Sequence, residues 1–113
     1  MVMIRVMQTV PDAVFKSLAD PTRRAIFECL VSDGEQTVRA LTDRTHVSQP
    51  MVSKHLGVLK HAGLVNDRPD GRSVFYRADA QGLAPLVDWM KFYRAFWAGK
   101  FDQLEDLLNR MDQ

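Results

Sequence analysis

Residues 48–61 carry side chains whose types and spacing suit the reading of a nucleic acid. Apolar residues recur at helical spacing on one side of this segment, at Val52, Leu56 and Leu59. The opposite arc is small, polar and basic: Pro50, Ser53, Lys54, Gly57 and His61, with Ser48 and Gln49 at the N-terminal tip. The major groove of DNA admits one helix, and short side chains let its backbone come close. The segment therefore predicts a recognition helix in which Gln49 and Ser53 contact base edges.

Basic side chains in and after this segment suit contacts to phosphate groups, which fix register and supply salt-dependent affinity. His55 lies at the edge between the buried and outward arcs, so a structural hydrogen bond and a phosphate contact are both open to it. The predicted DNA-binding residues are Ser48, Gln49, Pro50, Ser53, Lys54, His55, Lys60, Arg68 and Arg72.

Charge is unevenly distributed along the chain. The 113 residues carry a net charge of +1, but residues 37–77 hold seven Lys or Arg against three Asp, a net +4, and all three histidines. The remainder is therefore net −3. This polarity suits a protein that offers one face to a polyanion, although on charge alone a chance cluster on a solvated face is the alternative.

Capping residues predict the helices that hold this surface. An apolar side with Val14 predicts a short helix at the start, at 10–19, and Asp20-Pro21 starts the next, which Gly34 ends. Thr37 caps a further helix, and three residues separate that helix from Ser48. Two short helices joined by so short a connection are the helix-turn-helix pattern, at 37–61.

A hairpin is expected directly after the recognition helix. Asp70-Gly71 is a turn signal, and residues 73–77 are rich in β-branched and aromatic side chains. Two strands alone are marginally stable, so this ribbon at 64–77 must pack on the helices. Its length and its basic tip are those of a DNA-binding wing.

Apolar residues recur three and four apart from 83 to 111, which is the a/d pattern of a coiled coil. Trp89, Phe92 and Phe96 add a second apolar stripe, and one small core cannot hide both. A second subunit is the expected cover, and the alternative is packing on the chain's own helices. Whether this segment is one helix or is bent or broken at Gly99 stays open. The predicted dimerisation residues are Leu83, Val87, Met90, Trp97, Phe101, Leu104 and Leu108.

Length and composition exclude several classes of protein. We expect one domain, 1–113, in a cytoplasmic, nucleoid-associated protein, because no signal peptide and no apolar stretch of roughly 18 residues occurs. The single Cys29 can form neither an internal disulfide nor a cysteine zinc cluster. No catalytic constellation or phosphate-binding loop is present, so we expect neither an enzyme nor a cofactor. A winged helix that binds protein instead of DNA is the other alternative, and the basic arc disfavours it.

Three stretches, in the right order and spacing, resemble the ArsR-type (ArsR/SmtB) family of bacterial transcriptional repressors. They cover residues 15–77 nearly without a gap. They are Phe15-Lys16-Ser17-Leu18-Ala19-Asp20-Pro21-Thr22-Arg23-Arg24, Ser48-Gln49-Pro50-Met51-Val52-Ser53-Lys54-His55-Leu56, and Ala62-Gly63-Leu64-Val65 with Gly71-Arg72 and Tyr76.

The resemblance implies a mainly α fold with a small β-hairpin wing, in the order α-α-α-α-β-β-α. It implies a homodimer whose first and last helices, at 10–19 and 83–111, form the interface. The dimer would bind a partly palindromic operator in double-stranded DNA and release it when an inducer or metal arrives. On the matching positions, the recognition helix offers Ser48, Gln49, Ser53, Lys54 and His55, and the wing offers Arg68, Asp70, Gly71 and Arg72.

The family's two usual metal sites are absent from the sequence. The Cys-x-Cys pair expected nine and eleven residues before Ser48 is replaced by Arg39 and Thr37, and no histidine follows His61. We therefore expect no metal at these sites. Three switches stay open: a thiol switch at Cys29, against its reading as a core residue; a small apolar ligand near Trp89, Phe92, Phe96 and Trp97, against core or interface packing; and no inducer at all.

Overall fold

The structure is a computed structural model that describes residues 11–111, so Val10, the first residue of the predicted helix 10–19, lies outside the described residues. The chain divides into two compact units, one formed by Pro11–Ala84 and one that contains the described residues 85–111. Each unit is described by itself.

Four helices form most of the first unit: α2 (Asp12–Ala19), α3 (Pro21–Asp33), α4 (Val38–Thr45) and α5 (Gln49–His61). Their facing sides enclose a core of Val14, Ile26, Phe27, Leu30, Leu41, Val52, Leu56, Leu59, Leu64 and Val65. Cys29, expected on the inward side of α3, is only half-buried. That expectation was wrong in part, because the helix turns Phe27 into the core beside Ile26 and Leu30.

Capping residues begin three of these helices as predicted. The Asp20 side chain accepts a hydrogen bond from the N–H of Arg23 at 2.9 Å, and the Thr37 hydroxyl accepts one from Ala40 at 3.1 Å. Ser48 Oγ lies 3.4 Å from the N–H of Met51. Each bond satisfies a backbone donor that the first turn of a helix leaves unpaired, so the start of each helix is fixed by a local signal.

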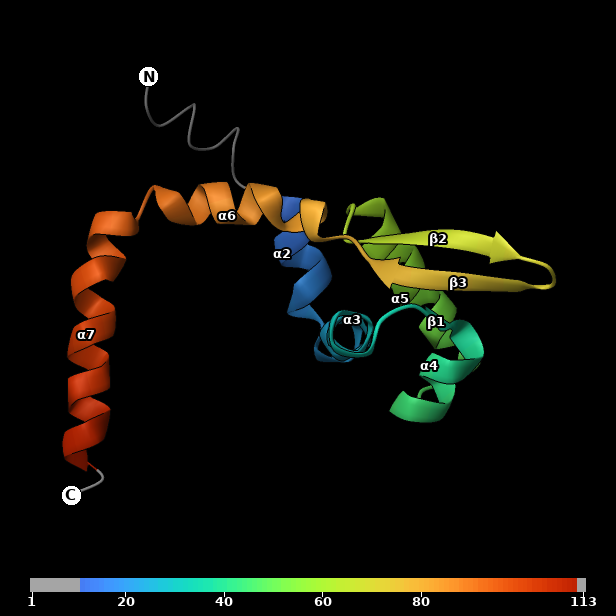
Figure 1. The fold of residues 1–113 in the computed structure, drawn as a ribbon, viewed down its shortest axis with the longest axis horizontal. Helices are drawn as coiled ribbons and strands as arrows, with labels where there is room; N and C mark the ends of the chain where they lie inside the picture. The colour runs from blue at the N-terminus through green and yellow to red at the C-terminus, as the bar shows by residue number, and fades with distance from the viewer. Residues whose placement is uncertain (1–10, 112–113) are drawn as a thin grey trace. The chain divides into compact units, whose positions relative to one another are not determined.

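A small antiparallel sheet follows α5, and Figure 1 shows β2 (Val65–Asp70) and β3 (Ser73–Ala78) as a long ribbon. Asp70 pairs with Ser73 next to the turn, where Gly71 has a φ of 61°. The predicted hairpin is therefore confirmed. A third strand, β1 (Gln36–Thr37), pairs with the other edge of β3, and the sequence analysis did not foresee it.

The junction after the sheet is packed closely against the end of α5. The short 3-10 helix η1 (Ala80–Leu83) begins after Asp79, whose N–H donates to the carbonyl of Leu64 at 2.8 Å. Gly82 lies against the backbone of Gly63, the residue before Leu64. A Cβ on Gly82 would stand 2.0 Å from the carbonyl oxygen of Gly63. Only glycine allows the two backbones to approach so closely.

Two helices make up the C-terminal segment: α6 (Ala84–Lys91) and α7 (Arg94–Met111). The break falls at residues 92–93, where the N–H groups of Phe92 and Tyr93 bond three residues back, at 3.2 and 3.0 Å. The helix does not break at Gly99, which lies inside α7. One helical glycine costs only about 1 kcal/mol, which a long helix tolerates.

The predicted fold class is confirmed: the chain is mainly α with a small β wing. Four helices, two wing strands and a C-terminal helical segment follow in the expected order, with β1 and η1 added.

Candidate nucleic-acid interface

Helix α5 has one buried side and one exposed side. Val52, Leu56 and Leu59 are 0% exposed and fasten the helix to the core. The N-terminal turns carry the exposed predicted contact residues Ser48, Gln49, Pro50, Ser53 and Lys54. None of these five side chains is buried in the core, so all five are exposed to solvent.

The connection between α4 and α5 is held by its own backbone conformation. His46 takes a left-handed conformation with a φ of 59°, which is uncommon for a residue other than glycine. The hydroxyl of Thr45 donates to the carbonyl of Leu41 at 2.7 Å, and its oxygen lies 3.4 Å from the N–H of Val47. This tight turn sets α5 against α4, and together they form the predicted helix-turn-helix.

His55 is the predicted contact residue that the structure places inside the protein. It is 5% exposed, and its Nδ1 lies 3.4 Å from a terminal nitrogen of Arg23. Arg23 also donates to the carbonyls of Ser17, at 2.6 Å, and of Lys16, at 3.0 Å. Because a guanidinium only donates, the facing His55 nitrogen acts as the acceptor. Of its two open roles, this geometry favours the structural hydrogen bond.

Two of the four predicted phosphate-binding cations are engaged in ion pairs. Lys60 Nζ lies 2.9 Å from a carboxylate oxygen of Asp67. The Arg68 guanidinium lies 2.7 Å from Glu35 and 3.5 Å from Asp70, with Phe75 beneath it at 5.0 Å from the ring centre. The hydrogen bond from Arg68 holds the pKa of Glu35 below its ordinary value and raises the pKa of Arg68.

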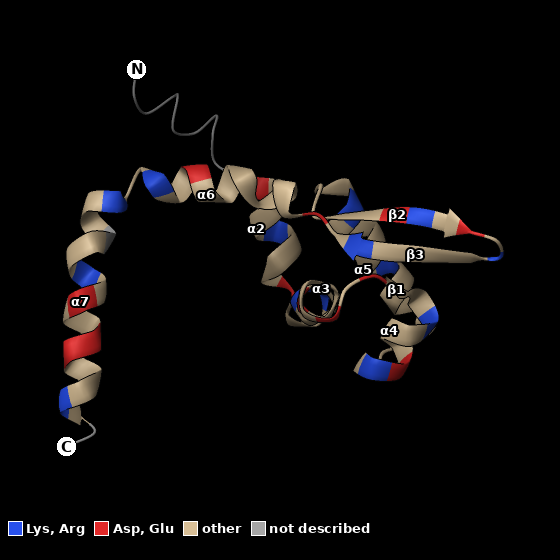
Figure 2. Ribbon diagram, viewed as in Figure 1, with Lys and Arg blue, Asp and Glu red and all other residues tan. Residues whose placement is uncertain are grey.

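The other two predicted phosphate-binding cations, Lys54 and Arg72, form no ion pair with the described residues. Figure 2 shows basic and acidic segments next to one another along β2, with the basic turn residue beyond them. The four predicted cations thus divide into two that have no ion-pair partner among the described residues and two that are held in ion pairs.

The acidic partners Glu35 and Asp67 were not predicted from the sequence. No spacing rule could have found Glu35, since it is 33 residues from Arg68 in the chain. Asp67 is seven residues from Lys60, beyond the end of α5, and they meet only because the chain turns back at Gly63.

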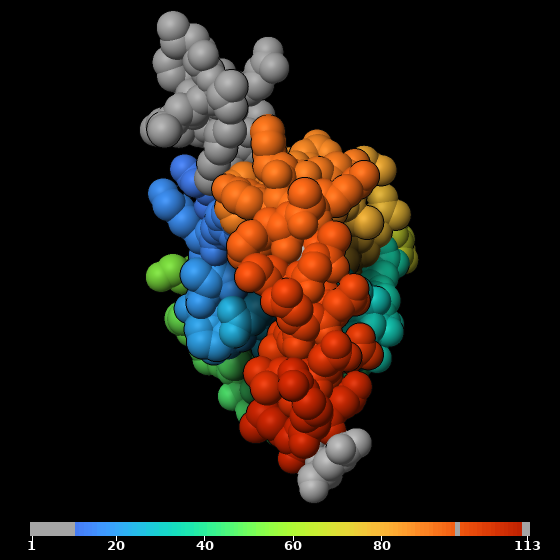
Figure 3. All heavy atoms as spheres, turned by 90° about the vertical axis from the view of Figure 1, so that its left-hand side faces the viewer, coloured from blue at the N-terminus to red at the C-terminus, as the bar shows by residue number. Residues whose placement is uncertain are grey.

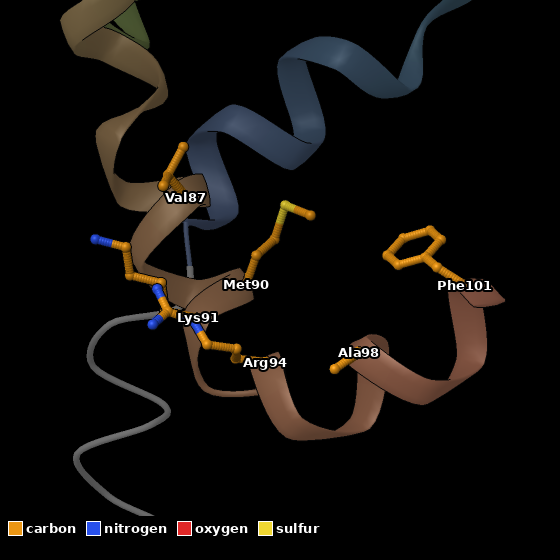
Figure 4. A pocket seen from close by; sticks show the side chains of 6 residues that line it. All are labelled: Val87, Met90, Lys91, Arg94, Ala98 and Phe101. Carbon is orange, nitrogen blue, oxygen red and sulfur yellow. The ribbon is translucent and has the colours of Figure 1, made fainter.

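The predicted dimerisation residues of α6 and α7 leave apolar surface exposed. Val87, Met90, Phe101, Leu104 and Leu108 are all exposed, and the predicted residue Leu83, which lies before α6 in η1, is half-buried. Figure 3 shows α7 as spheres along its length, in orange and red. Figure 4 shows six side chains at the corner between the two helices: Val87, Met90, Lys91, Arg94, Ala98 and Phe101. They line a hollow of about 520 Å³. Exposed apolar side chains therefore make up much of the surface of this segment, with Lys91 and Arg94 beside them at the hollow.

The positions of the family's usual cysteine site are used for other purposes. Thr37 caps α4, and Arg39 is an exposed cation in its first turn. In the part of the chain that the structure describes, no group of three His, Cys, Asp or Glu side chains could hold a metal ion. No helix among the described residues combines the length and apolar character that crossing a membrane requires.

A helix-turn-helix with an exposed polar recognition helix, followed by a basic hairpin, defines the class of winged-helix DNA-binding proteins. A sequence profile described as a helix-turn-helix domain matches residues 18–68.

Known proteins narrow this class. The HTH-type transcriptional regulator Rv2034 of Mycobacterium tuberculosis is 50% identical over 97 residues, which cover 85% of this chain and 89% of the relative. The transcriptional repressor SdpR of Bacillus subtilis is 34% identical over 77 residues, 68% of this chain and 84% of the relative. A crystal structure of the ArsR family transcriptional regulator RHA00566 superposes with a TM-score of 0.67 at 28% identity, covering 77% of this chain and 89% of that one.

The chain belongs to the ArsR-type family of helix-turn-helix transcriptional repressors. It is a DNA-binding regulator of transcription, and its relatives are regulators and not enzymes.

Proposed function

We propose that the chain represses transcription as a homodimer bound to a partly palindromic operator, with α5 in the major groove and the wing on the backbone or minor groove. The main support for this proposal is that α5 has one buried and one exposed side. Val52, Leu56 and Leu59 are 0% exposed, while the polar arc is open to solvent. A helix fastened on one side and polar on the other can enter a groove without unfolding.

Separate roles for the predicted residues follow from their surroundings. Gln49 and Ser53 read base edges, with Ser48 and Pro50 at the tip that enters the groove first. Lys54 and Arg72 bind phosphates directly, because no carboxylate of the described residues pairs with them. Lys60 and Arg68 bind phosphate after leaving their carboxylate partners, Asp67 and Glu35. His55 does not contact DNA and positions the helix through its contact with Arg23.

A second copy of the chain covers the apolar side of α6 and α7. The exposed apolar side chains recur at helical spacing from Val87 to Leu108, and exposed apolar area of this extent favours association. Two-fold symmetry then sets two copies of α5 about 34 Å apart, one turn of DNA, and gives paired half-sites. Occupying a promoter with this dimer blocks transcription.

The inducer, where one acts, is not a metal at the family's usual positions. Thr37 and Arg39 stand there, and neither a hydroxyl committed to a helix cap nor a guanidinium is a thiolate ligand. A small molecule or an oxidant remains the candidate switch.

Selection of bound fragments from a genomic library tests DNA binding. On the selected fragment, Gln49→Ala and Lys54→Ala should each weaken binding in a mobility-shift assay, while Lys100→Ala, on α7, serves as the matched control and keeps its affinity. Equal affinity of all four proteins would remove α5 from the interface.

Sedimentation velocity tests the dimer. Leu104→Glu and Leu108→Glu place a charge on the apolar side of α7 and should convert the dimer to a monomer. Gln103→Glu adds the same charge to a polar position of that helix and should leave the dimer intact. A wild-type monomer at micromolar concentration would contradict the proposal.

A further inference from the structure

A groove of about 450 Å³ lies between α2 and α5, inside the first unit. Its apolar wall is formed by Ala13 of α2 and by Val58 and Ala62 at the end of α5. Gly57 adds no side chain, and a Cβ there would meet no atom within 4 Å. Ligand sites in proteins usually have volumes of about 300–1,000 Å³, so the groove has the size for a small molecule.

The titratable side chains that line this groove are all basic. Lys16 of α2 and Lys54 and His61 of α5 line it, and none of the lining residues is acidic. Among residues 11–111, none of these three side chains has an ion-pair or hydrogen-bond partner. An anion bound here would meet unpaired cations, and its binding would break no existing ion pair.

A buried hydroxyl marks the same place. Ser17 also lines the groove, although it is 2% exposed, and its hydroxyl makes no hydrogen bond with the described residues. A buried polar group without a partner is unfavourable, and a ligand that supplies the partner removes this cost.

We propose that this groove binds a free anionic amphiphile, a carboxylate with a medium-length alkyl chain. The carboxylate lies between Lys16 and Lys54, within reach of the Ser17 hydroxyl, and the alkyl chain covers Ala13 and Val58. An inorganic anion would leave the apolar wall in water, and a neutral alkane would leave the cations unused. Both halves of the amphiphile are therefore recognised.

Occupancy of the groove competes with DNA. Lys54 lines the groove and, in the proposed function on which this step rests, also binds a phosphate. A carboxylate on Lys54 removes that contact and adds negative charge beside the DNA-binding arc. The amphiphile is therefore an inducer that acts without a metal or a thiol.

Isothermal titration calorimetry with decanoate, below the concentration at which it forms micelles, measures binding without DNA. Decanoate should bind the wild-type protein with one site per chain, and decanol and acetate should bind at least about tenfold more weakly. Ala13→Met, which fills the groove, and Lys16→Gln, which removes one cation, should each lower decanoate affinity about tenfold. Ala19→Met, at an exposed position of α2 outside the groove, is the matched control and keeps wild-type affinity.

A second measurement adds DNA. Decanoate should release the selected DNA fragment from the wild-type protein and from Ala19→Met, and not from Ala13→Met. Absence of calorimetric binding, or equal affinity in Ala13→Met and Ala19→Met, overturns the groove as the site. A change of sedimentation coefficient in ligand-free Ala13→Met would show that a second copy of the chain fills the groove, which also overturns the proposal. A protein that binds decanoate as expected and binds no DNA refutes only the proposed function.

Discussion

Lys54 and Lys60 form a natural pair of variants on one helix, because they differ mainly in their partner. Lys60 lies 2.9 Å from Asp67, and Lys54 has no carboxylate partner among the described residues. An ion pair between exposed groups contributes about 0.2–1 kcal/mol. Lys60 loses this contribution when its side chain leaves Asp67 to bind a phosphate. Its net contribution to the free energy of DNA binding is therefore smaller by that amount.

We therefore expect Lys54→Gln to weaken DNA binding more than Lys60→Gln does, by a factor of about 1.4–5 per protomer. Lys54→Gln should also reduce the slope of log affinity against log salt by about 0.9 per protomer. Between about 50 and 200 mM salt this change corresponds to about a 3.5-fold smaller loss of affinity per protomer.

Fluorescence anisotropy of the selected DNA fragment, titrated in a series of salt concentrations, measures both quantities. Asp67→Asn supplies the control, since it frees Lys60 and should make Lys60→Gln as costly as Lys54→Gln. Equal costs for the two lysines in the wild-type background, unchanged by Asp67→Asn, would refute the reasoning.

Three further predictions concern stability. Gly82→Ala should destabilise the fold by about 1–3 kcal/mol, because its Cβ would stand 2.0 Å from the Gly63 carbonyl oxygen. Gly99→Ala in α7 should instead raise helix stability by about 0.5–1 kcal/mol. Urea denaturation followed by circular dichroism measures both changes. Thr37→Ala removes the α4 cap and should cost about 1 kcal/mol in the same assay, with unchanged stability arguing against the cap. The hydrogen bond from Arg68 holds the folded-state pKa of Glu35 below its ordinary value, so Glu35 stabilises the fold at neutral pH and loses this contribution as the pH falls through the lowered pKa. The difference in urea midpoint between wild type and Glu35→Gln should therefore shrink on acidification, and a constant difference would exclude this ion pair as the cause.

Local signals account for most of what the sequence predicted correctly. Asp20, Thr37 and Ser48 begin their helices, and Asp70-Gly71 turns the hairpin, because a cap or a turn needs only residues two to four positions apart. The period of Val52, Leu56 and Leu59 also identified the buried side of α5, since helical spacing fixes which residues share a face.

Features that depend on distant partners were not predictable in the same way. Strand β1 has only two residues and forms because Gln36 lies opposite Tyr76, forty positions further on. The burial of His55 depends on Arg23, and the pairing of Arg68 depends on Glu35. In the C-terminal segment the period of apolar residues predicted helical structure, but it gave no sign of the break at 92–93, because apolar spacing continues across both α6 and α7.

The two-sided construction of α5 makes the domain a scaffold that could be reprogrammed. Gln49 and Ser53 make no side-chain hydrogen bond with any other described residue, so their replacement removes no intramolecular interaction of that kind. A library randomised at these positions, with Val52 and Leu56 kept, should yield folded regulators with new operator preferences. Mutually independent genetic switches could then be built from one parent sequence.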